Sequence, residues 1–192
     1  MKILVLSSSK EISDWLYEKG YHVFCMIEQI PTIQFVQEFD WIISYGYRHI
    51  IKQDVIDAIN GNIINLHISY LPWNRGADPN FWSFKENTPK GVTIHKVDAG
   101  IDTGPILVQK IVEFKDDEDT LRKTYDRLQR EIVLLFFESW EKIANRTIKP
   151  ISQQTIGTFY IGEELVPFSV GSFHLKKHAP ELFLDKPIKE WI

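Results

Sequence analysis

Residues 59–80 read INGNIINLHISYLPWNRGADPN, and the choice of fold rests on this stretch. Its apolar run, Ile63–Leu66, is short and follows an Asn-Gly turn signal, which is typical of a buried strand. Farther along, Asp78 and Pro79 form a typical start of a helix, because aspartate caps free amides and proline is tolerated in the first turn. The stretch therefore predicts a strand, a polar loop and a helix.

Short apolar runs alternate with amphipathic segments on both sides of this stretch. Strands are predicted at Ile3–Leu6, Tyr21–Ile27, Trp41–Ile43, Ile63–Leu66, Val92–Val97 and Ile106–Phe114. Helices are predicted at Glu11–Lys19, Pro31–Phe39, Gln53–Ile59, Asp78–Asn87 and Thr120–Ile143. This alternation indicates an α/β fold with a doubly wound, mostly parallel, Rossmann-like sheet. Only a short loop joins the last two strands, so we expect the far end of the sheet to be mixed.

The longest predicted helix ends the alternation. Its apolar residues recur at helical spacing and predict a buried stripe. The stripe consists of Leu121, Tyr125, Leu128, Ile132, Leu135, Phe136, Trp140 and Ile143. Short pieces broken by glycine and proline follow it. We therefore expect a catalytic α/β domain over residues 1–145 and a small C-terminal extension over residues 146–192.

The composition excludes several classes of protein. The 192 residues are 44% hydrophobic and 25% charged, with a formal net charge of −4, which gives no general attraction to nucleic acid or anionic membranes. The single cysteine, Cys25, allows neither an intrachain disulfide nor a cysteine-rich zinc site. No apolar run reaches the length of a membrane span, and Ile3–Leu6 is too short for a signal-peptide core. We expect a cytoplasmic protein.

The turn after the first predicted strand also excludes a function. Residues 6–11 read LSSSKE and contain no glycine, whereas a dinucleotide-binding turn carries G-x-G-x-x-G at this place. Binding of NAD or FAD through a Rossmann fingerprint is therefore not expected.

Polar side chains follow two of the predicted strands. Asn65 and His67 end the fourth strand and, being two residues apart, lie on one face of it. The loop at residues 98–105, DAGIDTGP, follows the fifth strand and carries Asp98 and Asp102. Ligands of open α/β sheets bind beyond the carboxyl ends of the strands, so we expect the amide, the imidazole and a carboxylate to converge there.

Such a trio suits acyl transfer. An amide and an imidazole both donate to one oxygen and so stabilise a tetrahedral intermediate, while a carboxylate orients the imidazole and assists proton transfer. A nucleophile elbow, G-x-S-x-G, is absent, which favours direct attack without a covalent enzyme intermediate. Taken singly, each residue is more typical of a structural hydrogen bond at a strand end. A zinc site of His67, His95 and Asp102 is an alternative that no compact ligand spacing supports, and His95 is expected to pack within its strand.

These residues resemble a known family, the folate-dependent formyltransferases, which include the phosphoribosylglycinamide, methionyl-tRNA and nucleotide-sugar N-formyltransferases. The resemblance is best from about residue 40 to residue 112. The matching motifs are Asn65-Leu-His67, Ser69-Tyr-Leu-Pro72, Arg75-Gly76, Gly91-Val-Thr-Ile-His95 and Asp98-Ala-Gly-Ile-Asp102-Thr-Gly104-Pro-Ile106.

The resemblance implies a catalytic trio of Asn65, His67 and Asp102, N10-formyltetrahydrofolate as the formyl donor, and no metal. It also implies a pocket for the pterin ring, in which Ile50, Ile51 and Ile101 supply apolar walls. The residues implied to contact the donor are Arg48, His49, Ile50, Ile51, Ser69, Tyr70, Leu71, Pro72, Val97, Asp98 and Ile101. For Ile50 and Ile51, plain core packing is the alternative.

The resemblance leaves several acceptors to compare. LSSSKE replaces the glycine-rich phosphate loop of the phosphoribosylglycinamide enzymes. Methionyl-tRNA formyltransferases add a basic C-terminal domain, whereas residues 151–192 hold four lysines against five acidic residues. Formyltetrahydrofolate hydrolases usually carry an N-terminal regulatory domain, which we do not expect before Met1. The stretch Pro72–Trp82 and the short C-terminal piece most resemble the sugar N-formyltransferases.

The resemblance thus implies an amino-deoxy sugar acceptor, nucleotide-linked and destined for lipopolysaccharide, and a homodimer that packs through the apolar residues around Phe159 and Tyr160. The candidate acceptor contacts are Trp73, Arg75, Asp78 and Trp82. The basic segment at residues 171–178, GSFHLKKH, either reaches a pyrophosphate or is a solvated turn. A methionyl-tRNA formyltransferase-like or hydrolase activity remains an alternative. A non-catalytic folate- or nucleotide-sugar-binding protein is another.

Overall fold

The structure is a computed structural model. It describes residues 1–28, 31–115, 119–153, 157–160 and 187–190. The described part of the chain forms two compact units. Unit 1 comprises residues 1–67, 94–107 and 136–152, and unit 2 comprises residues 68–93, 108–135 and 153–192.

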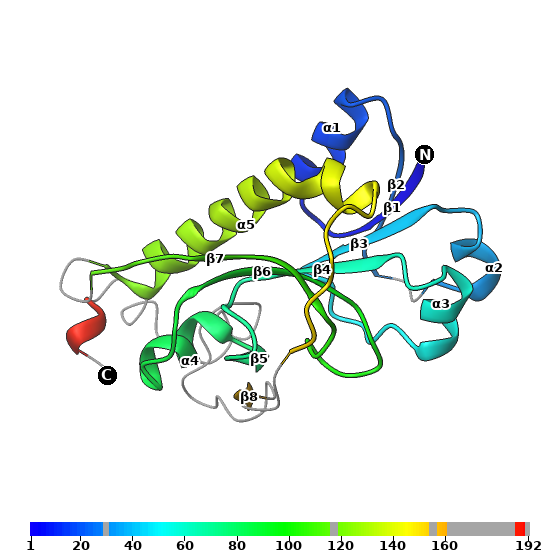
Figure 1. Cartoon of the computed structure of the whole chain (residues 1–192). Helices are drawn as coiled ribbons and strands as arrows, with labels where there is room; N and C mark the ends of the chain where they lie inside the picture. Colours follow the sequence, from blue (N-terminus) through cyan, green and yellow to red (C-terminus); the bar gives the residue numbers. More distant parts are fainter. Residues whose placement is uncertain (29–30, 116–118, 154–156, 161–186, 191–192) are drawn as a thin grey trace. The chain divides into compact units, whose positions relative to one another are not determined.

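A six-stranded sheet in the order β2-β1-β3-β4-β6-β7 organises the fold (Figure 1). Its strands are β1 (Lys2–Leu6), β2 (His22–Met26), β3 (Trp41–Tyr45), β4 (Ile63–His67), β6 (Gly91–Lys96) and β7 (Ile106–Ile111). The first four are parallel. The β6 and β7 strands are antiparallel, since the Lys96 amide donates to Pro105 at one end and the Val112 amide donates to Lys90 at the other. The predicted mixed α/β sheet is confirmed.

The five predicted helices are present, the first and the last shifted by one residue and the other three shorter than predicted, and a 3₁₀ turn that was not predicted is added. They are α1 (Lys10–Glu18), α2 (Ile33–Val36), α3 (Gln53–Ala58), α4 (Pro79–Lys85), α5 (Leu121–Ala144) and the 3₁₀ turn η3 (Ile188–Glu190). The α2 helix begins after Thr32, whose hydroxyl accepts a hydrogen bond from the Phe35 amide. The expectation that Asp78 caps α4 is wrong for its side chain, which makes no cap bond. The residue stands at the N-cap with φ 50°, so its carboxylate is turned away from the free amides.

Helices cover both faces of the sheet in unit 1, as a doubly wound fold requires. On one face α2 and α3 bury Val36, Val55 and Ile56 against Leu4 of β1 and Ile42 of β3. On the other face α1 and the C-terminal part of α5 pack together (Figure 1). There the ring of Trp15 lies 4.7 Å from the ring of Phe137, and that of Trp41 lies 5.8 Å from that of Trp140.

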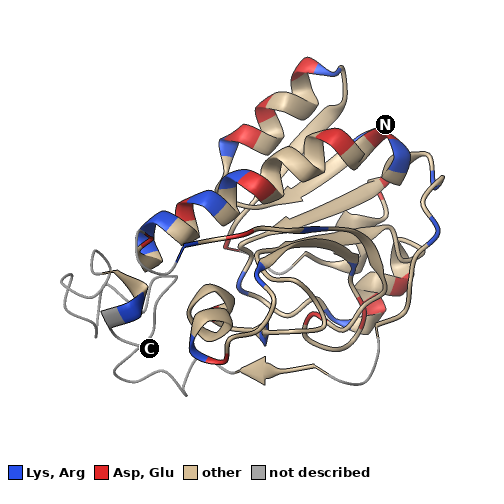
Figure 2. Ribbon diagram, turned by 60° about the vertical axis from the view of Figure 1, so that its left-hand side comes forward, with Lys and Arg blue, Asp and Glu red and all other residues tan. Residues whose placement is uncertain are grey.

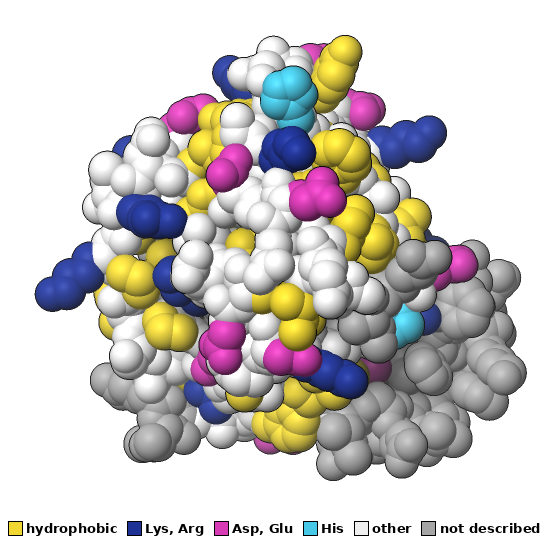
Figure 3. Space-filling model, turned by 90° about the vertical axis from the view of Figure 1, so that its right-hand side faces the viewer, with side chains coloured by type: hydrophobic (Ala, Val, Ile, Leu, Met, Phe, Trp, Pro, Cys, Tyr) yellow, Lys and Arg dark blue, Asp and Glu magenta, His cyan; other side chains and the backbone are white. Residues whose placement is uncertain are grey.

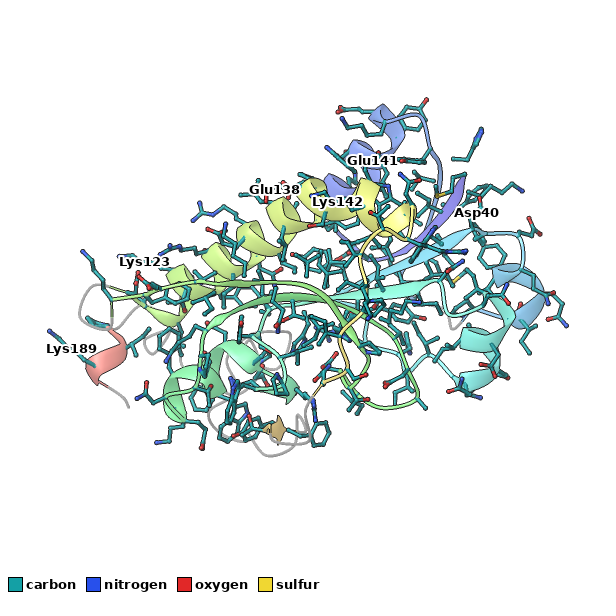
Figure 4. The ribbon with its side chains drawn as sticks, viewed as in Figure 1. Asp40, Lys123, Glu138, Glu141, Lys142 and Lys189 are labelled. Carbon is teal, nitrogen blue, oxygen red and sulfur yellow. The ribbon has the colours of Figure 1, made fainter. Side chains whose placement is uncertain are left out.

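The predicted stripe of α5 is buried, with Tyr125 half-buried. Glu138, Glu141 and Lys142 lie on the same helix (Figure 4), and Glu141 accepts a 2.9 Å hydrogen bond from the Tyr21 hydroxyl. Partial burial and this bond raise the pKa of Tyr21 above its ordinary value.

Trp140 is fully buried and contacts Phe136 and Trp41, so we expect its loss to be costly. Trp140→Ala leaves a large cavity and lowers the free energy of unfolding by about 3–5 kcal/mol. Urea denaturation followed by circular dichroism measures this. Leu134→Ala on the same helix is the control, since Leu134 is 49% exposed and its loss costs little. Equal unfolding midpoints for the two variants would contradict the packing account.

Unit 2 contains a second, smaller pairing that the sequence pattern did not predict. Strand β5 (Arg75–Gly76) pairs in parallel with β8 (Phe159–Tyr160). Phe81 and Phe84 of α4 form a core with Leu121 and Ile188. Two-residue strands show no alternation of apolar and polar residues, which is why neither was predicted.

Charges of both signs are distributed along the helices (Figure 2). On the face drawn in Figure 3, hydrophobic side chains form small groups between charged ones. None of the described helices has the length and apolar character needed to cross a membrane.

Candidate active site

The predicted trio comes together within unit 1. Asn65 is the third residue of β4 and His67 its last, and Asp102 lies in the loop between β6 and β7. The Asn65 amide donates from Nδ2 to Asp102 Oδ1 over 3.1 Å, and His67 Nδ1 lies 3.5 Å from Asp102 Oδ2. The His67 and Asp102 side chains are 9% and 11% exposed, which weakens screening of their charges by solvent.

His95 of β6 is a fourth member that the sequence reasoning assigned to packing. Its Nε2 lies 3.3 Å from Asn65 Nδ2 and 3.4 Å from Asp102 Oδ1, and the residue is 2% exposed. His95 and Asn65 meet because β4 and β6 are neighbours in the sheet and run in opposite directions, with the Val97 amide donating to the Ile63 carbonyl. The sequence of β6 alone gives no sign of this pairing.

The hydrogen bonds fix the orientation of the Asn65 amide. The Lys96 carbonyl can only accept, so His95 Nδ1, 2.8 Å away, carries a hydrogen. In neutral His95, Nε2 then accepts, and its partner is an Asn65 N–H. The second N–H points to Asp102. This places the amide nitrogen among the three titratable side chains, an assignment made from the network.

The loop that carries Asp102 is tightly built. Asp98 accepts from the Gly100 amide over 3.1 Å and from the Thr103 hydroxyl over 2.6 Å, which closes the turn. Asp102 has φ 53°, a left-handed conformation that holds its carboxylate toward β4 and β6. At Gly104 a Cβ would collide with the Lys96 backbone, so the loop returns to the sheet too closely for any side chain.

We therefore expect Gly104→Ala to shift this loop. The methyl group must displace backbone at Lys96, which costs about 1–3 kcal/mol of stability, as overpacking generally does. The displacement moves Asp102, so activity falls more than the unfolding temperature alone would explain. Calorimetry and an activity assay on the same sample separate the two. The control is Gly61→Ala, where nothing lies within 4 Å of the added atom but φ is 67°, so it carries backbone strain without a collision. Full activity in Gly104→Ala would contradict this account.

The residues expected to contact the donor's pterin lie on two stretches of unit 1. Arg48, His49 and Ile50 are exposed, and Ile101 is 42% exposed. Ile51 instead lies in the buried core cluster, and Val97 packs against the same cluster. Both stretches are therefore anchored to the same core cluster, one through Ile51 and the other through Val97. Ile50 and Ile101 present apolar surface, as walls of a ligand pocket do, while Ile51 serves packing.

Tyr47 stands beside this group. Its ring contacts His49 at a centroid distance of 5.2 Å. Burial raises the pKa of Tyr47 above its ordinary value, so the hydroxyl stays protonated at neutral pH.

The segment Ser69–Pro72 belongs to unit 2 and is held from within. The buried Thr93 hydroxyl donates to the Ser69 carbonyl over 2.7 Å and accepts from the Leu71 amide over 3.2 Å. Gln109 donates to the Leu71 carbonyl over 2.7 Å. Ser69 and Leu71 are almost fully buried, whereas Tyr70 is half-buried, as is Asp98 in the other unit. Ser69 and Leu71, two of the residues expected to contact the donor, are thus buried in the protein interior.

The expected acceptor contacts also lie in unit 2. Trp73 is half-buried, and Asp78 is 8% exposed. Arg75 donates from Nε and Nη2 to Gln153 Oε1, at 3.0 and 2.8 Å, so one side of its guanidinium group is engaged. The ring of Trp82 stacks on that of Tyr160 at 3.9 Å, which covers one of its faces. The basic segment at 171–178 lies outside the described residues, as do Leu165, Val166 and Phe168 of the apolar stretch expected to pack in a homodimer.

No group of three or more His, Cys, Asp or Glu side chains in the described ranges is arranged to hold a metal ion. His67, His95 and Asp102 are neighbours, but they meet around the Asn65 amide. A pocket of about 560 Å³ occurs elsewhere in unit 1, at the amino ends of β3 and β4, and contains none of the predicted site residues. It is lined by Met1, Gln37, Phe39, Asp40, Trp41, Ala58, Ile59, Asn60, Asn62 and Arg146.

Comparison with known proteins points to one family. Residues 32–138 match the formyl transferase family model. The chain is 33% identical over 132 residues to phosphoribosylglycinamide formyltransferase of Bacillus subtilis, covering 67% of each protein. It is 31% identical over 151 residues to methionyl-tRNA formyltransferase of Bifidobacterium adolescentis, but spans only 44% of that enzyme.

Solved structures give the same answer. The formyltransferase PseJ of Anoxybacillus kamchatkensis, crystallised with UDP-4,6-dideoxy-4-formamido-L-AltNAc and tetrahydrofolate, is 39% identical. Its TM-score is 0.85, with 100% of this chain and 98% of that one covered. A sugar N-formyltransferase candidate from Mycobacterium tuberculosis has the same fold, with a TM-score of 0.76 and 23% identity over 91% of this chain and 84% of that one.

Proposed function

Because this chain belongs to the formyl transferase family, we propose that it moves a formyl group from N10-formyltetrahydrofolate to the primary amine of a nucleotide-linked amino-deoxy sugar. The chain is a folate-dependent formyltransferase. Its likeness to PseJ over the full length, at 39% identity, supports sugar N-formylation. The nucleotide-linked acceptor is carried over from the ligand of that structure.

The observation that carries the chemistry is that the Asp102 carboxylate lies within 3.5 Å of both the Asn65 amide and the His67 imidazole. In the proposed reaction the amine nitrogen attacks the formyl carbon, a C–N bond forms, and the carbonyl oxygen becomes an oxyanion. The Asn65 N–H and the His67 imidazole donate to this oxygen. Collapse of the intermediate breaks the bond to N10 of the donor.

Proton transfer completes the balance. The attacking amine loses one proton, and N10 gains one as tetrahydrofolate leaves. We assign the first transfer to the Asp102 carboxylate, whose Oδ1 accepts from the Asn65 amide and whose Oδ2 lies 3.5 Å from His67 Nδ1. The products are the formamido sugar and tetrahydrofolate, with no covalent enzyme intermediate.

The experiment is an end-point mass-spectrometric assay. The protein is incubated with N10-formyltetrahydrofolate and a panel of nucleotide-linked amino-deoxy sugars, with a control that lacks any acceptor. We expect a formyl mass gain on one sugar. Release of tetrahydrofolate without acceptor would instead indicate a hydrolase. In a parallel incubation with methionyl-tRNA, formylation of that acceptor alone would indicate the other alternative. Folate binding without any turnover would overturn the enzymatic assignment.

A further inference from the structure

Asn74 is a fully buried amide in the middle of the loop that carries the expected acceptor contacts. It has φ 56° and 0% exposure. Its side chain donates from Nδ2 to the Thr88 hydroxyl over 2.8 Å and accepts at Oδ1 from the Thr158 hydroxyl over 3.0 Å. The same Thr158 hydroxyl accepts from the Asn74 backbone amide over 2.8 Å. One hydroxyl thus holds both the backbone and the side chain of one residue.

The neighbouring backbone is held by the same segment. The Arg75 amide donates to the Thr158 carbonyl and the Ala77 amide donates to the Tyr160 carbonyl, both over 2.9 Å. A Cβ at Gly76 would collide with the Tyr160 carbonyl, which shows how closely the two strands approach. The path of residues 74–77 is therefore defined by a segment 84 residues later in the chain.

We propose that Asn74 and Thr158 are positioning residues for the acceptor, and that residues 157–160 thereby form part of the binding site without taking part in the chemistry. This rests on the proposed function, which assigns Trp73, Arg75 and Asp78 to the acceptor. Those three residues flank Asn74 in sequence. Their direction depends on the left-handed conformation of Asn74, which asparagine tolerates and which the bonds to Thr88 and Thr158 hold in place.

The hydrogen bonds between Asn74 and Thr158, which we call the clamp, involve no charged group. The effect of removing them can therefore be predicted. Thr158→Val keeps the shape of the side chain but removes the hydroxyl, which leaves the Asn74 amide and Oδ1 without that partner. A buried polar group in this situation drives the loop toward water, so we expect acceptor kcat/KM to fall by roughly ten- to a hundredfold. Thr158→Ser retains the hydroxyl and should recover most of the loss.

Steady-state kinetics test the proposal on the full-length protein. We expect Thr158→Val to raise the acceptor KM while kcat and the donor KM stay within about twofold of wild type, because uniform binding alone is lost. Thr147→Val is the matched control, since the Thr147 hydroxyl bonds only the Lys142 carbonyl on the exposed end of α5. An unchanged acceptor KM, or an equal rise for donor and acceptor, would overturn the proposal.

Hydrogen exchange gives a readout that needs no acceptor. We expect the amides of residues 74, 75 and 77 to exchange faster in Thr158→Val, while that of Leu71, held by Thr93, is unchanged. Wild-type exchange at all three would overturn the clamp whatever the acceptor is. A different result separates the two proposals. If the wild-type protein formylates no sugar but these amides exchange faster in Thr158→Val, the proposed function and the assignment to the acceptor both fail. The clamp itself then still stands.

Discussion

Asp102→Asn lowers the rate of formyl transfer by about 10²–10⁴-fold, the usual range for loss of a general acid–base group, and leaves the unfolding temperature near that of wild type. Asparagine has the size of aspartate and, after glycine, tolerates the left-handed conformation seen at φ 53° best, so the loop keeps its path. Only the charge is lost. The His67 imidazole, 3.5 Å from the carboxylate, then lacks its anionic neighbour.

Single-turnover kinetics with saturating donor measure this effect. Asp126→Asn serves as the control, because it makes the same change at an exposed place on α5. Donor affinity, followed by fluorescence titration, should change little. An Asp102→Asn enzyme with near-normal turnover would remove Asp102 from the mechanism, and a large fall in unfolding temperature would make its function structural.

Asn65→Ala is expected to lower kcat by about 10²–10³-fold, as loss of one oxyanion donor does in other acyl-transfer enzymes. The substitution removes the N–H groups that face Asp102 and His95. It does not touch the exposed residues assigned to the pterin, so the donor should bind nearly as before. A protein that only binds folate would lose nothing measurable by this change.

The comparison for this variant is Asn145→Ala, which removes an exposed amide at the last turn of α5. Asn65→Asp is a useful third protein, because it replaces the donor with a second carboxylate beside Asp102. We expect it to be at least as inactive as Asn65→Ala. If Asn65→Ala turns over within about threefold of wild type, the loss is far smaller than the contribution of one oxyanion donor. That result would exclude a donor function for this amide.

The part of the site that could be predicted from sequence is the part that local patterns describe. Asn65 and His67 follow an apolar run, and Asp102 sits in a glycine-containing loop after another. The rule that ligands bind at the carboxyl ends of parallel strands then predicts their convergence. In the structure β6 instead runs antiparallel to β4, and the loop after β6 brings Asp102 to Asn65. Similarly, the stripe of α5 follows from helical spacing alone, and seven of its eight residues are buried in the core.

The unpredicted parts depend on contacts between distant residues. Nothing near Arg75 in the sequence indicates that Gln153 binds its guanidinium, and nothing near Asn74 indicates Thr158. The pairing of β5 with β8 involves two residues on each side, too few to show a period. His95 was missed for a different reason, since a histidine in a strand that reads as core gives no sign of the group it faces.

The amide of Asn65 also bears on how the enzyme tells a bound substrate from a reacting one. In the absence of substrate its hydrogens are directed to the Asp102 carboxylate and to His95. A neutral formyl carbonyl is a weaker acceptor than a carboxylate, so its arrival does not draw the amide away. An oxyanion competes on equal terms. In the proposed mechanism the switch of acceptor therefore occurs as charge develops. We expect the amide to contribute little to the heat of donor binding while it favours the tetrahedral intermediate.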